Sequence, residues 1–362
     1  TRLDAEADEN SEAAVMIIKE VEDVRVENLT LTGGYSEGHG CTGGGGLLLA
    51  ANDMFNLEGD EGNNIATSTP VIENVIIKDN HSHNGGGLSI FRVDGPSLSN
   101  VIIRNNTNSF MGAGIFHYGS SSTMNDVEIH DNVGYGSDWF GYENMGHGGG
   151  IFFTGSDGTF TGMSIHDNTA AMHGGGIGAE GRNGWTMTNS SIHNNSAPSL
   201  GGGLWLWDNN NGSGDLEGAS PILTNVTIES NNALGWDGGG VLVNNSNPVF
   251  ENCTIQNNST SGSGGGICFW DNSTAVVNNC LISGNEATSG GGIHSTATDL
   301  TIENTIISEN EATSGAGIYF MSPVATLRNL TIVNNIASSF GGGIGIWGFS
   351  SHIIMNCTIT GN

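Results

Sequence analysis

Aromatic side chains recur at two fixed places in this chain, and their chemistry suits stacking on sugar rings or packing against a partner or a covering loop. One place comes directly after the apolar residue that ends "GGGI", and the other comes two residues later. The aromatic residues at these places are Phe91, Phe116, Tyr118, Phe152, Trp205, Trp207, Trp270, Tyr319 and Trp347. Isolated surface aromatics are ordinary, but a row of them indicates an interaction surface. We therefore expect these residues to form a binding face.

Two glycine- and asparagine-rich segments carry oxygen ligands of the kind that calcium prefers. They are "NDMFNLEGDEGNN" at residues 52–64 and "DNNNGSGDLEG" at residues 208–218. The ligand candidates are Asp208, Asn210, Asp215 and Glu217, together with Glu58, Asp60 and Glu61 in the other segment. Their spacing does not complete an EF-hand, because position 12 of that pattern is not Glu. Two interpretations stay open, a calcium site and a solvated acidic loop, and the sequence suggests no cofactor besides calcium.

Three histidines occupy one position of successive repeats, in the phrases "IHDN", "IHDN" and "IHNN". They are His130, His166 and His193, and Lys78 and Arg104 hold the same position in earlier repeats. Stacked repeats would bring neighbouring imidazoles to about 5 Å, where two of them could share a metal ion. Duplication of repeats also produces such columns without any ligand, and we favour a surface ladder.

The five cysteines do not indicate a metal cage, because their number is odd and no CxxC pair occurs. Cys253 and Cys280 hold the same inward position of adjacent repeats, which Val or Leu fills elsewhere. That spacing admits a disulfide. Buried thiols that act as small apolar residues fit the column better.

These candidate residues lie on a repeat whose period is about 26 residues. Glycine triplets such as Gly148–Gly150 and Gly290–Gly292 recur, each followed by Ile, Leu or Val. A second motif, N-x-x-I-x-x-N, recurs out of phase with the triplets. Its central residues are Ile77, Ile103, Ile129, Ile165, Ile192, Ile228, Ile255, Ile282, Ile307, Ile332 and Ile359. Most motifs carry a second apolar residue two positions before the isoleucine, which is the periodicity of a strand.

Short strands repeated at this interval cannot bury their apolar faces singly, so they must stack. The sequence predicts an all-β fold, a parallel β-helix of about twelve coils with about 26 residues in each. The first Asn of each motif, such as Asn252 or Asn279, is expected to stack into an amide ladder. The last Asn, from Asn80 through Asn335, is expected to take a turn conformation with positive φ.

Residues 1–362 are expected to form a single domain, in which acidic residues 1–23 make an atypical first coil. Insertions near residues 52–64, 133–147 and 208–218 interrupt the repeat. Eight Lys and Arg against 37 Asp and Glu give a formal net charge of −29. Such a surface repels phosphate backbones and anionic lipids, so we expect no nucleic acid partner. No apolar run reaches the roughly 18 residues of a membrane-spanning helix, so we expect no direct membrane insertion.

The pairing of "GGGI" with "ENCTIQNN" or "RNLTIVNN" resembles the right-handed parallel β-helix repeat family of secreted bacterial surface proteins. That family includes polymorphic-outer-membrane-type repeats, and the resemblance runs from about Val24 to Asn362. It implies a right-handed β-helix, extracellular or on the cell surface, with a structural or adhesive role. The partners that we expect are polysaccharide, or other copies of this chain in head-to-tail or lateral contact.

Members of that family usually carry a signal peptide and often a C-terminal anchor. The sequence starts at Thr1 without a signal-like segment, and its last N-x-x-I-x-x-N motif closes at Asn362. We expect either that the native chain continues past residue 362 or that another molecule stacks on this end.

A polysaccharide-degrading enzyme of the same fold, a lyase or a glycoside hydrolase, is the alternative function. "GHG" at Gly38–Gly40 and at Gly146–Gly148 is similar to a motif of β-helix hydrolases, but the accompanying Asp-Asp pair and Arg-x-Lys are absent. Lyases of this fold need a Lys or Arg base beside carboxylates, and the chain has only eight basic residues. The sequence therefore favours a protein without catalytic activity.

Overall fold

The computed structural model is a parallel right-handed β-solenoid of about 11 turns, with about 27 residues per turn. The expected fold class is confirmed, and both numbers are close to the predicted ones. The structure describes residues 1–6, 13–19, 23–37, 44–50, 66–67, 69–136, 146–208, 219–270, 272–296, 299–321, 324–348 and 351–362. These residues contain no helix that is long and apolar enough to cross a membrane.

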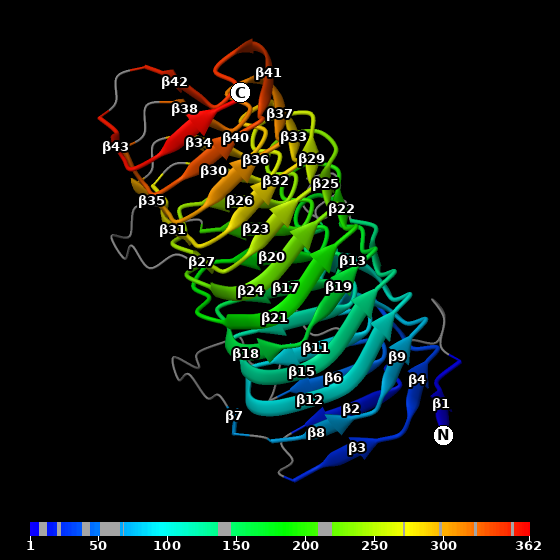
Figure 1. Cartoon of the computed structure of the whole chain (residues 1–362). Helices are drawn as coiled ribbons and strands as arrows, with labels where there is room; N and C mark the ends of the chain where they lie inside the picture. The colour runs from blue at the N-terminus through cyan, green and yellow to red at the C-terminus, as the bar shows by residue number, and fades with distance from the viewer. Residues whose placement is uncertain are drawn as a thin grey trace. The chain divides into compact units, whose positions relative to one another are not determined.

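The contacts of the chain group into two compact units. The first unit comprises Thr1–Met172 and Gly176–Gly178, and the second comprises His173–Gly175 and Ala179–Asn362. Within each unit, parallel strands from successive turns form three kinds of sheet (Figure 1). The motif sheet carries the N-x-x-I-x-x-N isoleucines, the glycine sheet is formed by the strands after the glycine triplets, and the corner sheet lies between them in the chain.

In the first unit, the three sheets are built from short strands of two to twelve residues. The motif sheet contains β1 (Arg2–Asp4), β3 (Arg25–Glu27), β4 (Thr30–Thr32), β7 (Ala66–Thr67), β8 (Val71–Glu73), β9 (Ile76–Lys78), β12 (Val93–Arg104), β15 (Ser121–His130), β18 (Asp157–Thr161) and β19 (Ser164–His166). The corner sheet contains β5 (Tyr35–Ser36), β10 (His81–Asn84), β13 (Thr107–Met111) and β16 (Val133–Gly134). The glycine sheet contains β2 (Met16–Lys19), β6 (Leu47–Ala50), β11 (Leu88–Phe91), β14 (Ile115–Tyr118) and β17 (Ile151–Thr154).

The second unit repeats this arrangement, and β20 (Ile177–Glu180) has residues in both units. The motif sheet contains β21 (Thr186–His193), β24 (Ile222–Glu229), β27 (Val249–Glu251), β28 (Thr254–Gln256), β31 (Thr274–Asn278), β32 (Leu281–Ser283), β35 (Asp299–Glu303), β36 (Ile306–Ser308), β39 (Val324–Arg328), β40 (Thr331–Val333), β43 (Ile353–Met355) and β44 (Thr358–Thr360). The corner sheet contains β22 (Ser196–Ala197), β25 (Asn232–Ala233), β29 (Ser259–Thr260), β33 (Glu286–Ser289), β37 (Glu311–Ser314) and β41 (Ile336–Phe340). The glycine sheet contains β23 (Leu204–Trp207), β26 (Val241–Asn244), β30 (Ile267–Phe269), β34 (Ile293–Thr296), β38 (Ile318–Met321) and β42 (Ile344–Trp347).

The predicted isoleucine column forms the core of each unit. Its members from Ile77 to Ile332 are fully buried, whereas Ile359 in the last turn is 48% exposed. Each residue lies beside its counterpart in the next turn, as Ile255 lies beside Ile282. Burying one such side chain is worth about 2–3 kcal/mol. The column therefore holds successive turns together and fixes which residues face outward.

A ladder of buried asparagines runs beside this column, and it is made by the last Asn of each motif. Asn258 donates from Nδ2 to Asn285 Oδ1 at 3.0 Å and to the carbonyl oxygen of Ile228 at 3.0 Å. Its backbone N–H donates to the same Asn285 Oδ1 at 2.9 Å. These bonds satisfy buried polar groups at the turn that ends each motif-sheet strand.

The prediction for the last Asn was therefore wrong, because its φ is not positive. The residue directly before it takes that conformation instead, as Asn257 does with φ 55°. The turn must direct the Asn258 amide inward, and the left-handed residue before it makes the bend. The first asparagine of each motif was expected to form an amide ladder. One of its hydrogen bonds confirms this, because Asn329 Nδ2 donates to Asn304 Oδ1 at 3.0 Å.

The glycine triplets serve the sharp bend into the glycine sheet. Gly148 has φ 68°, and a Cβ at this position would lie 2.2 Å from the carbonyl oxygen of Ile151. Both conditions exclude a larger residue there. The bend therefore sets the direction of β17 and of the outward side chains that follow.

The insertions lie largely outside the described residues. Residues 52–64 lie wholly outside them, and so do residues 137–145 of the second insertion and all of residues 208–218 except Asp208. The single-domain organisation and the atypical first coil of residues 1–23 stay predictions.

Candidate binding face

The outward side of the glycine sheet in the second unit carries a group of tryptophans. On β23, Leu204 and Leu206 enter the core, so Trp205 and Trp207 point to the opposite face. Their rings stack with centroids 5.7 Å apart. Trp207 in turn meets Trp270 edge to face, with centroids 5.9 Å apart.

Asp237 fixes the orientation of Trp270. The indole Nε1–H donates to Asp237 Oδ2 at 3.0 Å, and the backbone N–H of Ser263 donates to Asp237 Oδ1 at 2.6 Å. Hydrogen bonds to an ionised carboxylate are stronger than neutral ones. Trp207, Trp270 and Asp237 are all half-buried, so part of each indole is held in place and part remains accessible. We call these three residues the tryptophan face.

Two further polar side chains lie on the same side of the sheet. Cys268 Sγ is 3.6 Å from His294 Nδ1, and the His294 ring stacks on Tyr319 with centroids 5.5 Å apart. Burial lowers the pKa of His294 to about 4, against the opposing effect of the Asp237 charge. Burial raises the pKa of the Cys268 thiol, and the Asp237 charge raises it further. Both groups are neutral at pH 7, so the pair supplies no thiolate nucleophile.

The predicted aromatic face is partly buried, which corrects the expectation that all its members are open to a partner. Phe91, Phe116, Phe152 and Trp205 are at most 8% exposed. Tyr118, Trp207, Trp270 and Tyr319 are half-buried, and Trp347 is 63% exposed.

The burial follows from the bend before each glycine strand. Histidines that precede the glycine triplets lie against two of the buried rings: His147 is 6.1 Å from Phe152 of the same turn, and His173 of the preceding turn is 5.0 Å from Trp205, between ring centroids. Position on the strand does not decide accessibility alone, because Phe91 at the second place is buried and Tyr319 at the first place is half-buried. Fewer of the predicted aromatic residues are therefore accessible than the sequence indicated.

Of the predicted calcium ligands Asp208, Asn210, Asp215 and Glu217, the structure describes only Asp208. Asp208 is half-buried, and burial raises its carboxyl pKa against the opposing charge of Arg182. Asn210, Asp215 and Glu217 lie outside the described residues, as do Glu58, Asp60 and Glu61. Among the residues that the structure describes, no cluster of three His, Cys, Asp or Glu side chains is arranged to hold a metal ion. Calcium binding by these loops stays a prediction.

The histidine ladder is confirmed for one pair in the first unit. His130 and His166 stack with centroids 5.0 Å apart and an angle of 7° between the rings. Each donates from Nδ1 to the next residue in the chain, Asp131 or Asp167, at 2.7 Å. Burial lowers the pKa of His166, but its hydrogen bonds to Asp167 and Glu128 outweigh that effect and raise the pKa overall.

A second histidine cluster, His81 and His83 with Glu37, lies on the corner sheet of the first unit and was not identified from the sequence. His81 Nε2 bonds to Glu37 Oε1, while Ser109 donates to Glu37 Oε2 at 2.9 Å. His83 Nδ1 lies 3.1 Å from Ser109 Oγ and 3.9 Å from Glu37 Oε2. The phrase "HSH" gives the signal, because residues two apart on a strand share a face.

Other candidate residues have structural roles. His147 of the second "GHG" is buried against Phe152, so it does not face a substrate. Cys253 and Cys280 are buried free thiols, and the backbone N–H of Cys253 donates to Cys280 Sγ at 3.3 Å. The other "GHG", at Gly38–Gly40, lies outside the described residues.

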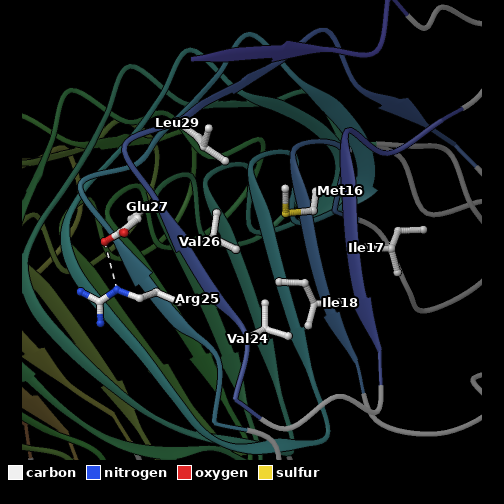
Figure 2. A pocket seen from close by; sticks show the side chains of 8 residues that line it. All are labelled: Met16, Ile17, Ile18, Val24, Arg25, Val26, Glu27 and Leu29. Carbon is white, nitrogen blue, oxygen red and sulfur yellow. Dashed lines mark hydrogen bonds and ion pairs between the residues drawn. The ribbon is translucent and has the colours of Figure 1, made fainter.

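A cavity of about 480 Å³ opens beside the first turns of the first unit (Figure 2). Its lining is mainly apolar: Met16, Ile17, Ile18, Val24, Val26 and Leu29. The two charged side chains that line it, Arg25 and Glu27, bind each other at 3.0 Å. These side chains belong to the ordinary packing of a turn, and they do not form a set of polar groups that would orient a ligand.

Comparisons with known proteins concern the fold. The family description "Right handed beta helix region" matches residues 216–362. The mannuronan C-5 epimerase AlgE4 A-module of Azotobacter vinelandii is similar in structure, with 15% identity, 93% of this chain and 91% of that chain covered, and a TM-score of 0.48. PfbA, a surface adhesin of Streptococcus pneumoniae, shows 10% identity, coverage of 91% and 83%, and a TM-score of 0.26. No curated protein matches the chain in sequence.

Proposed function

We propose that this protein is an extracellular β-helix that binds polysaccharide through the tryptophan face. The observation that carries the proposal is the edge-to-face contact of Trp207 and Trp270, with Trp270 oriented by Asp237. Indole rings offer broad apolar faces, against which the C–H faces of sugar rings can pack. Because strands β23 and β30, which flank β26, hold both rings, the two indoles would lose little side-chain freedom when a ligand binds.

The charge of the chain favours uncharged sugar units at this face. The formal net charge is −29, and Asp237 places one carboxylate directly beside the ring of Trp270. At this face a polyanion would meet repulsion from the Asp237 carboxylate, whereas hydroxyl groups can donate hydrogen bonds to it. The neutral Cys268 and His294 next to this face supply packing rather than a nucleophile. We therefore propose binding, in an adhesive or structural role, rather than cleavage.

Affinity electrophoresis in gels that contain an uncharged polysaccharide, such as a β-glucan or a mannan, tests the proposal. Trp207→Ala and Trp270→Ala should each weaken retardation by about tenfold, since about 60 Å² of apolar surface buried against a sugar ring is worth about 1.5 kcal/mol. Trp347→Ala is the matched control, because Trp347 is the most exposed member of the predicted face and lies on β42 rather than β30. Unchanged retardation of both variants, or equal loss with the control, would refute the assignment.

A further inference from the structure

An arginine in the first unit has a positive φ, a conformation that glycine or asparagine adopts at the same corner of several other turns. Arg92 follows β11 and has φ 51°. At this corner Gly119, Gly155, Gly181, Asn245 and Gly348 of other turns have positive φ, whereas Asp208 does not. A long side chain in this region strains the backbone. Strain of this kind is retained where the side chain has a use.

The Arg92 side chain lies over a pair of aromatic rings. Phe91 and Tyr118 stack with centroids 4.8 Å apart and an angle of 9° between the rings. The Arg92 guanidinium carbon lies 5.6 Å from the Phe91 centroid and 5.9 Å from that of Tyr118. Cation–π contact holds the planar guanidinium on this platform. Because Arg92 is exposed, a carboxylate can reach its fork of N–H donors.

Arg92 has no carboxylate partner, although the chain is rich in carboxylates. The ion pairs of the described residues join Arg2, Arg25, Lys78 and Arg328 to Asp or Glu side chains. Within that part of the chain no ion pair joins Arg92 to an acidic residue, not even to Asp94 two positions along. Arg92 is exposed, so its charge is available to an anion from outside.

A polar atom without a partner lies on the same side of β11. Leu88 and Ile90 enter the core, so Ser89 and Phe91 share the outward face. Ser89 is fully buried, and its Oγ has no hydrogen-bond partner in the structure. Buried hydroxyls are normally paired, but Ser89 is fully buried, so this hydroxyl does not contact a ligand that binds at Arg92.

We propose that Arg92, on its platform of Phe91 and Tyr118, binds the carboxylate of an acidic sugar. The guanidinium takes the carboxylate through two parallel N–H···O bonds, and the accessible part of Tyr118 packs against the sugar ring. An acidic sugar fits better than an acidic peptide, because a flat aromatic platform beside the fork suits a ring. The site belongs to the first unit, and it stands independently of the tryptophan face.

Isothermal titration with trigalacturonate and with its methyl ester tests the site, because esterification removes the negative charges and keeps the sugar rings. Wild type should bind the acid at least about tenfold more tightly than the ester. Arg92→Gly should remove that preference and, because it relieves the strained backbone, should raise the Tm by about 1–3 °C. The rise also shows that the variant folds. Arg92→Lys should retain only part of the preference, since an ammonium lacks the fork.

The control is Arg104→Gln, which removes one positive charge at the other basic residue for which the described part of the chain gives no carboxylate partner. It should leave the preference unchanged. Equal affinity of wild type for the acid and the ester, equal affinity for tetraglutamate, or an undiminished preference in Arg92→Gly would overturn the proposal.

Discussion

The indole N–H of Trp270 donates to Asp237 Oδ2 at 3.0 Å, and the two residues come from successive turns of the second unit. The other carboxylate oxygen of Asp237 accepts a hydrogen bond from the backbone N–H of Ser263. A single carboxylate therefore joins a loop, a neighbouring turn and an accessible aromatic ring. This arrangement explains why Trp270 keeps a fixed orientation at a surface position.

Asp237→Ala should lower the free energy of unfolding by about 1–3 kcal/mol, because two hydrogen bonds lose their charged acceptor. It should also weaken polysaccharide binding, because Trp270 loses its fixed orientation. Chemical denaturation and affinity electrophoresis measure the two effects. Asp299→Ala, at an exposed aspartate on β35, is the matched control and should change neither.

Ile255→Asp should lower the free energy of unfolding by several kcal/mol, because it places an unpaired charge in a fully buried column. Thermal unfolding followed by circular dichroism measures the shift. Asn257→Asp introduces the same carboxylate two residues along at an exposed position and should have little effect. A melting curve for Ile255→Asp that matches wild type would show that the column does not form the core.

Stability should fall on acidification because two buried histidines must stay neutral. Burial lowers the pKa of His117 to about 3 and that of His294 to about 4. A depressed pKa contributes stability that is present above the unfolded value of about 6.5 and is lost as pH falls towards the folded value. Each contribution is on the order of 3–5 kcal/mol.

His166 acts in the opposite sense. Its raised pKa contributes stability below the unfolded value, and that contribution is lost as pH rises through the folded value. Denaturant unfolding between pH 4 and pH 8 measures the balance. His294→Gln should lose less stability on acidification than wild type does, whereas His166→Gln should lose more. Parallel curves for wild type and His294→Gln would contradict the account.

Calcium binding by residues 52–64 and 208–218 predicts that a chelator lowers the Tm, because a ligand that binds only the folded state stabilises it. Calorimetry with EGTA, and then with calcium restored, measures the effect. The variant Asp215→Asn with Glu217→Gln should show a smaller difference than wild type. Superimposable scans of wild type with and without chelator would remove calcium from the account.

The fold could be predicted from the sequence because its repeat is regular. Columns such as that of Ile255 identify the strand, its inward face and its neighbour in the next turn. The asparagines could not be assigned in the same way. Both Asn252 and Asn258 fit a ladder by spacing, and only the turn geometry shows that Asn258 is the buried one.

The site was predicted less completely, because burial on an outward face depends on what covers it. Trp205 and Trp207 are equivalent by alternation, yet the ring of His173 covers only the first. Asp237 was missed because it lies at the bend, outside both motifs. Arg92 was missed because its backbone strain has no signal in the sequence beyond the absence of Gly or Asn at that corner.

The most direct test of polysaccharide binding is an NMR titration of the indole N–H groups. The chain has seven tryptophans, so a sample labelled with ¹⁵N-tryptophan gives seven signals that single substitutions assign. Addition of an uncharged oligosaccharide should shift the signals of Trp207 and Trp270 and leave that of Trp347 in place. Saturating oligosaccharide that shifts Trp347 alone, or none of the seven signals, would contradict the proposed function.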